Sequence, residues 1–213
     1  MFFFALLSLT RVALDLGFVH RPLFAALLWA GLTFKLQPAL SAGIFFELLW
    51  LDLFPAGTFI PPQALLSLTA TLTVLACLPG ADMRTTALLL VATLPLAYLG
   101  AWVEQRYRTR QNVSYNKLIT WNRQGVAHAY TPNRLIVQAL AEKFLLNFFL
   151  FALCVLPLLA AMRALQPWLS SGPQPSWPML WIGAGIGAVL ALRLRKAYAL
   201  AGISLMLGVL ATL

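Results

Sequence analysis

Long apolar runs separated by short polar pieces dominate the chain. The runs are Phe2–Val19, Pro22–Phe34, Pro38–Leu53, Ala64–Leu78, Ala87–Val103, Phe144–Met162, Trp177–Leu192 and Ala197–Leu213. A transmembrane helix needs about 20 apolar residues, so several of these runs are shorter than a full crossing. We predict an all-α fold, a polytopic transmembrane helix bundle of roughly six to eight segments with short, Pro-broken or re-entrant helices.

Prolines break up the first half of this pattern. They stand at Pro38, Pro55, Pro61, Pro62 and Pro79. Irregular backbone at membrane depth is tolerated only where it is buried in protein or lines a wet cavity. The connection between Phe54 and Gln63, with three prolines and a glycine, is therefore where we expect such a cavity.

The composition agrees with a membrane protein. Hydrophobic residues make up 61% of the 213 residues and charged residues 10%, and the mean hydropathy is +0.83. Average soluble domains are roughly half apolar and about a quarter charged. A soluble chain of this length could not bury so much apolar surface. We expect one integral-membrane domain that covers residues 1–213.

The net charge of +9 indicates loops on the cytoplasmic face rather than nucleic-acid binding, because such loops are rich in Lys and Arg. Basic residues gather in a segment of about residues 104–134, where Glu104 is the only acid. They are Arg106, Arg108, Arg110, Lys117, Arg123 and Arg134. We expect this segment to be cytoplasmic and able to contact membrane lipids with anionic headgroups, or an acidic partner surface.

Two smaller pieces complete this topology. Residues 193–196 form a second basic cluster, which predicts a second cytoplasmic turn between the last two apolar runs. Residues 167–178 are rich in Pro, Ser and Gly and lack Lys and Arg, which predicts a loop on the outer face.

Motifs for catalysis or cofactor binding are missing from the sequence. It has no Walker-type phosphate loop, no HExxH, no CxxC and no nucleophile elbow. We therefore expect no catalytic residue, no metal and no cofactor in this chain. Uphill movement of a substrate would draw its energy from a partner protein or an ion gradient.

Three acids lie within otherwise apolar sequence: Asp15, Glu47 and Asp52. A charge at the centre of a bilayer costs about 2.5–3.5 kcal/mol, so such residues face the bundle interior or a wet cavity. They are candidates for function. The alternative is a structural salt bridge, for example between Glu47 and Lys35.

One block of the sequence resembles a known family. It comprises His20-Arg21-Pro22-Leu23, then Gly43 to Leu51 with Glu47-Leu48, then Gly57 and Ile60-Pro61-Pro62. This is similar to the membrane IIC subunit of the mannose/fructose/sorbose class of the bacterial phosphoenolpyruvate-dependent sugar phosphotransferase system. That family has roughly R-P-L, then G-x-x-x-E-L-x-x-L-G, then G-x-x-x-P-P-D. Here Asp52 replaces the last glycine of the second piece and Gln63 replaces the acid of the third.

The resemblance implies a sugar-translocating subunit in the bacterial inner membrane. It would bind a hexose-like sugar and present it to a cytoplasmic IIB subunit, whose phosphohistidine supplies the phosphoryl group. A IID-type membrane subunit and the IIA and IIB phosphocarriers would be its partners in an oligomeric complex, with IIB or IIA docking on the basic segment.

A sugar site needs carboxylates and amides as partners for hydroxyl groups. The candidates beside the Pro-broken connection are Glu47, Asp52, Thr58 and Gln63, and Asp15, Asn112 and Asn116 are further candidates. Trp50 and Phe54 could cover the C–H face of a sugar ring, or could be packing aromatics.

Three other functions fit the same sequence. The chain could be an ion-coupled secondary transporter of another small polar solute, a membrane-embedded enzyme, or a non-transporting assembly subunit. Neighbouring genes for IIA, IIB and IID subunits would favour the phosphotransferase function over all three.

Overall fold

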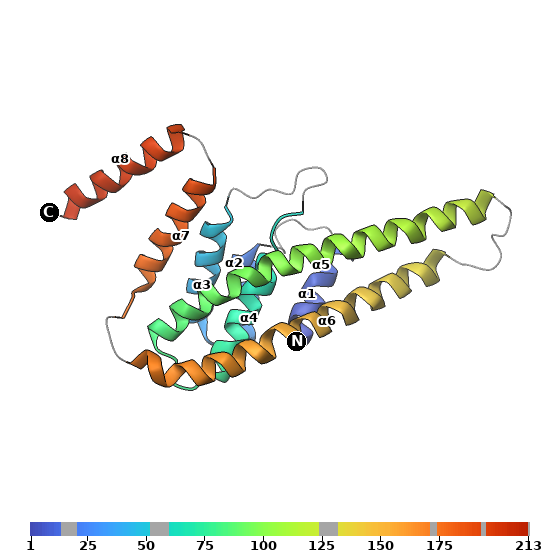
Figure 1. The fold of residues 1–213 in the computed structure, drawn as a ribbon, viewed down its shortest axis with the longest axis horizontal. Coiled ribbons are helices and arrows are strands. Elements are labelled where there is room, and N and C mark those ends of the chain that lie inside the picture. Colours follow the sequence, from blue (N-terminus) through green and yellow to red (C-terminus); the bar gives the residue numbers. More distant parts are fainter. Residues whose placement is uncertain (14–20, 52–59, 124–131, 171–173, 193–194, 213) are drawn as a thin grey trace.

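A computed structural model describes residues 1–13, 21–51, 60–123, 132–170, 174–192 and 195–212. Within these ranges every regular element is a helix, which confirms the predicted all-α class (Figure 1). The α-helices are α1 (Phe2–Ala13), α2 (Pro22–Thr33), α3 (Leu36–Leu49), α4 (Ala64–Cys77), α5 (Met83–Arg123), α6 (Pro132–Leu165), α7 (Trp177–Ala191) and α8 (Arg195–Thr212), and a 3-10 helix, η2, covers Gln166–Ser170.

Each α-helix coincides with one predicted apolar run, but α5 and α6 are longer than their runs. Helix α5 continues past Val103 to Arg123, and α6 begins at Pro132, well before Phe144. The chain from Glu104 to Arg123 contains no Pro or Gly, so nothing in the sequence ends the helix there. The basic segment is thus largely helical.

The two long helices form an antiparallel pair whose far ends project beyond the other helices (Figure 1). We call residues 105–123 of α5 and 132–142 of α6 the arm. By length and composition, Met83–Val113 and Ile136–Leu169 are the two segments of the described chain that could cross a membrane.

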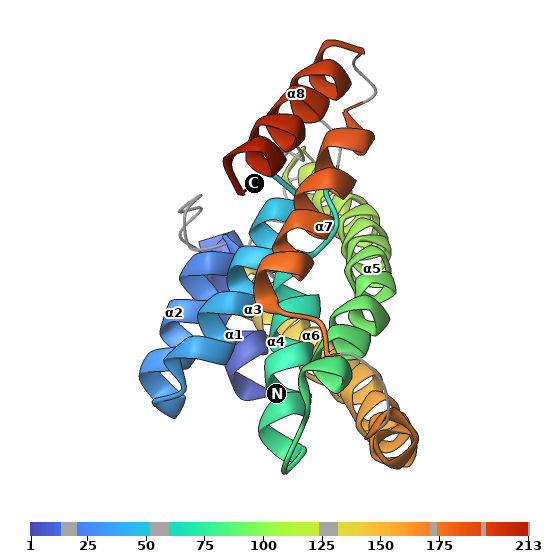
Figure 2. The same cartoon turned by 90° about the vertical axis from the view of Figure 1, so that its left-hand side faces the viewer.

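Helices α2 and α3 are short and pack side by side as a hairpin (Figure 2). Their 12 and 14 residues correspond to lengths of about 18 and 21 Å, against about 30 Å for the hydrocarbon core of a bilayer. A Cβ on Gly43 would lie 2.6 Å from the Cβ of Ala26, so the glycine is what allows the two backbones to approach so closely. The reversal between them is at Phe34, which adopts a left-handed conformation with φ of 57°.

Helix α4 lies at the centre of the bundle and contacts α1, α2, α3, α5 and α6. Its side chains Leu66, Leu68 and Val74 are completely buried, together with Phe46 of α3 and Phe151 of α6. On the outside, α7 packs along α3, where the indole N–H of Trp181 donates to the carbonyl of Ser41 at 3.0 Å. Helix α8 contacts α7.

Candidate functional site

Glu47 connects the end of α3 to the beginning of α2. Its Oε1 lies 3.0 Å from Nη1 of Arg21, and its Oε2 accepts a hydrogen bond from the backbone N–H of Leu23 at 3.3 Å. The first N–H groups of a helix have no partner within the helix, and the helix dipole favours an anion beside them. Pro22, which has no N–H, starts the helix, so Leu23 presents the first free donor.

The partner of Glu47 is therefore Arg21, and the alternative pairing with Lys35 is wrong. Lys35 precedes α3, at the opposite end of that helix from Glu47. The contacts also bring together the first two pieces of the sequence motif, which are separated along the chain. About a fifth of the Glu47 side chain and nearly half of the Arg21 side chain remain exposed, so the pair is accessible to a ligand.

Gln63 precedes α4 and is buried against α5. Its backbone N–H donates to the carbonyl of Ala97 at 2.9 Å, and the residue is 7% exposed. Its side-chain Oε1 is the single buried side-chain nitrogen or oxygen without a hydrogen-bond partner in the described chain. Gly100 faces it, and any Cβ there would collide with this oxygen.

A strip of buried hydroxyl groups continues from Gln63 along the α4–α5 contact. Ser67 and Thr71 follow Gln63 at intervals of four residues and so share its face of α4. The Ser67 hydroxyl donates to the carbonyl of Thr93 at 2.6 Å, and the hydroxyls of Thr71 and Thr93 are 3.0 Å apart. Sequence reasoning missed this strip. Its signal was that polar residues recur every fourth position in an otherwise apolar helix.

Two of the predicted site residues, Glu47 and Gln63, lie at one end of the bundle, because α3 ends where α4 begins (Figure 2). Trp50 caps α3 and stacks on Phe46, with ring centroids 5.5 Å apart, so it acts at least as a packing residue. The predicted site residues Asp15, Asp52 and Thr58, and also Phe54, lie outside the described residues.

Asn112 and Asn116 are not part of this end of the bundle. Both are exposed on the arm, and they follow Gly100 by about 18 and 24 Å along α5. Glu47 therefore lies in the last turn of α3 and Gln63 immediately before α4, whereas the two asparagines lie on the arm.

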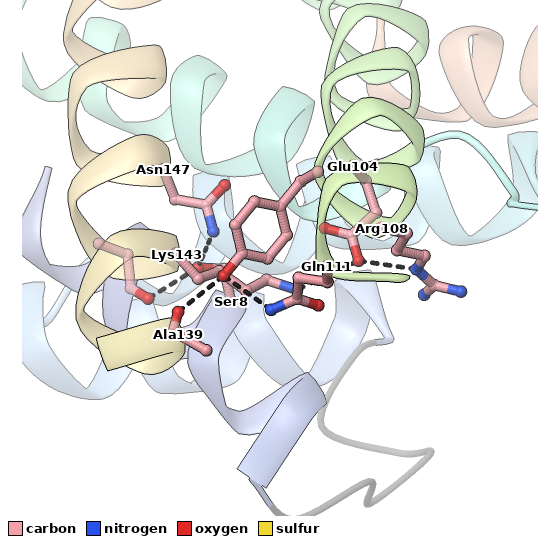
Figure 3. Close-up of polar contacts among 9 residues, drawn as sticks. Ser8, Glu104, Arg108, Gln111, Ala139, Lys143 and Asn147 are labelled. Carbon is pink, nitrogen blue, oxygen red and sulfur yellow. Dashed lines mark hydrogen bonds and ion pairs between the residues drawn. The ribbon is translucent and has the colours of Figure 1, made fainter. Parts of the chain in front are cut away.

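A second polar network connects α1, α5 and α6 where the arm leaves the bundle (Figure 3). Glu104 accepts from Lys143 Nζ and from Arg108 Nε, each at 3.1 Å. The phenol of Tyr107 donates to the carbonyl of Ala139 at 2.7 Å, and Asn147 donates to the Ser8 hydroxyl at 2.8 Å. The sequence did not predict this network, because its members come from distant segments. Only the i, i+4 spacing of Glu104 and Arg108 was visible.

Within the described ranges, no three His, Cys, Asp or Glu side chains cluster as metal ligands would. Comparison of the chain with family models, with curated proteins and with solved structures gives no match. The function therefore has to be argued from the resemblance of the motif and from the geometry of the site.

Proposed function

We propose that this chain is a multi-pass protein of the bacterial inner membrane and the sugar-translocating IIC subunit of a mannose/fructose/sorbose-class phosphotransferase system. The two long apolar helices and the four short ones favour a polytopic bundle with re-entrant hairpins. In this proposal α2 and α3 enter the membrane and return, because each is too short to cross it.

The observation that carries the proposal is the polar end of the bundle formed by Glu47 and Gln63. A sugar hydroxyl is both a donor and an acceptor. The Oε1 of Gln63 is buried without a donor, which costs about 1–3 kcal/mol. A sugar hydroxyl would supply that donor once the α4–α5 contact opens beside it. The accessible carboxylate of Glu47, held in place by Arg21 and Leu23, would accept a second hydroxyl.

In this function the chain binds and positions the sugar, and its partners perform the chemistry. A cytoplasmic IIB subunit would transfer its phosphoryl group to the bound sugar, after receiving it from IIA. A IID-type subunit would cover part of the apolar surface. Phe149 and Leu153 of α6 are each about two-thirds exposed or more, and would face either lipid or this subunit.

The decisive experiment is phosphoenolpyruvate-dependent sugar phosphorylation in inverted vesicles that contain this chain and its IIA, IIB and IID partners. We expect phosphorylation to require this chain. Glu47→Gln should reduce it by roughly tenfold or more, since one lost charge-assisted hydrogen bond is about 1.5–3 kcal/mol. Gln63→Met removes a neutral hydrogen bond of about 0.5–1.5 kcal/mol, so its reduction should be smaller, roughly two- to tenfold. Cys77→Ser, at an exposed position, is the matched control. Ion-driven uptake of a solute, without its phosphorylation, would contradict the proposal.

A further inference from the structure

One face of α5 is exposed along most of the helix and changes character along its length. Its exposed members are spaced by three, four or seven residues, as positions on one face of a helix are. They are Leu88, Val91, Tyr98, Trp102, Arg106 and Arg110. We call these six residues the α5 stripe. Side chains of the stripe are apolar first, then aromatic, then basic.

The stripe lies on the opposite side of α5 from the network with α6. Glu104, Tyr107 and Gln111 occupy the inner face, where Glu104 and Tyr107 are buried against α6 (Figure 3). Tyr98 and Trp102 are 61% and 56% exposed, so no described helix covers the middle of the stripe. The carboxylate of Glu104 is committed to Lys143 on the inner side.

The aromatic and basic parts of the stripe are in direct contact. The guanidinium carbon of Arg106 lies 5.2 Å from the centre of the Trp102 ring. A guanidinium group over an aromatic ring still offers N–H donors to an anion. Arg110 follows one turn later on the same side, so two guanidinium groups flank one stretch of surface.

We propose that the α5 stripe binds an anionic phospholipid, with the phosphate held by Arg106 and Arg110 and an acyl chain along Tyr98 and Val91. This inference rests on the membrane insertion contained in the proposed function. It places the membrane boundary at Trp102, where aromatic rings prefer the headgroup level. A soluble acidic protein fits less well, because it would leave the adjoining apolar surface uncovered.

Native mass spectrometry of the full chain in mild detergent tests the proposal, with phosphatidylglycerol and phosphatidylcholine of identical acyl chains as probes. We expect phosphatidylglycerol to bind more tightly. Each arginine near anionic headgroups contributes a factor of about five, so Arg106→Gln with Arg110→Gln should weaken phosphatidylglycerol binding about 30-fold and phosphatidylcholine binding little. Arg163→Gln, an exposed arginine near the other end of the helix pair, should leave both unchanged.

Equal binding of the two lipids by the unmodified protein would overturn the proposal, as would an unchanged preference in the double variant. If the double glutamine variant does not fold, the difference between phosphatidylglycerol and phosphatidylcholine binding by the unmodified protein still tests the proposal. Polyglutamate binding to the arm without any lipid preference would indicate that the basic residues bind an acidic protein, and would also overturn the proposal.

A chain that supports sugar phosphorylation but shows no lipid preference would refute this inference alone. A chain that alkali extracts from membranes would refute the proposed function as well.

Discussion

Glu104 and Lys143 form an ion pair of 3.1 Å between α5 and α6, and both side chains are almost completely buried, at 6% and 4% exposure. Buried charges are expensive unless they are paired, so each residue makes the other tolerable in an apolar setting. Lys143 also lies 5.7 Å from the centre of the Tyr107 ring. The pair fixes the register of the two long helices where the arm leaves the bundle.

Breaking this pair on one side should destabilise the protein strongly. Glu104→Gln removes the carboxylate that pairs with the buried Lys143, and we expect a loss of about 3–5 kcal/mol in the free energy of unfolding. Lys143→Met should cost less, because Glu104 keeps its bond to Arg108. The double variant should recover much of this loss. Arg108→Gln is the control, because that side chain is half exposed and its bond should contribute about 0–1 kcal/mol. Circular dichroism during unfolding in detergent measures the stability of the two single variants, the double variant and the control. A Lys143→Met variant as stable as the parent would refute the structural role of the pair.

Substitutions at Glu47 and Arg21 should separate binding from structure. Glu47→Gln keeps an acceptor for the Leu23 N–H but loses the charge, and we expect sugar affinity to fall by roughly ten- to a hundredfold. Arg21→Gln leaves the carboxylate in place, so its effect on affinity should be smaller. Sugar titration of purified, folded variants provides the measurement. If both variants lose the same stability and neither loses affinity, Glu47 serves only to join α2 and α3.

Gly100 should not tolerate a side chain, because a Cβ would displace the amide oxygen of Gln63. We expect Gly100→Ala to cost about 1–3 kcal/mol through overpacking and to lower sugar binding. The matched control is Gly31→Ala in α2, where nothing lies within 4 Å of the added methyl group. That change should stabilise the helix by about 0.5–1 kcal/mol. Thermal unfolding midpoints that fall equally for both variants would argue against the close contact.

The arm should face the cytoplasm. After Cys77→Ser removes the exposed native thiol, Thr120→Cys on the arm should resist a membrane-impermeant maleimide in intact cells and react in inverted vesicles. Trp168→Cys, at an 84% exposed position in η2, should show the opposite behaviour. Labelling of the Thr120→Cys variant in intact cells would reverse the assigned topology.

Apolar runs predicted the number and positions of the helices well, because burial or lipid contact demands such runs. The ends of the apolar runs did not predict where α5 ends. The apolar run ends at Val103, before Glu104, whereas the helix continues to Arg123 through a sequence that contains no Pro or Gly to break it. Side-chain polarity marks where a helix leaves an apolar environment, not where its backbone ends.

The candidate site was predicted in part. Glu47 stood out as an acid in an apolar run, and Gln63 through the motif. Lys35, the example given of a structural partner for Glu47, is nearer in sequence, but Arg21 is the residue that approaches when α2 and α3 fold back on each other. The contact between Gln63 and Gly100 depends on the packing of α4 against α5, which no local pattern reveals.

Helix α5 runs without interruption from the level of Gln63 to the tip of the arm. Gly100 and Arg123 are separated by about 35 Å along its axis. A tilt of about 5° at Gly100 would therefore move the tip by about 3 Å, by the same helix geometry. Pro95, the proline inside α5, lies just before this point, where helices most often bend. A change in the packing of Gln63 against Gly100 that tilted α5 would therefore cause its largest displacement at the tip of the arm.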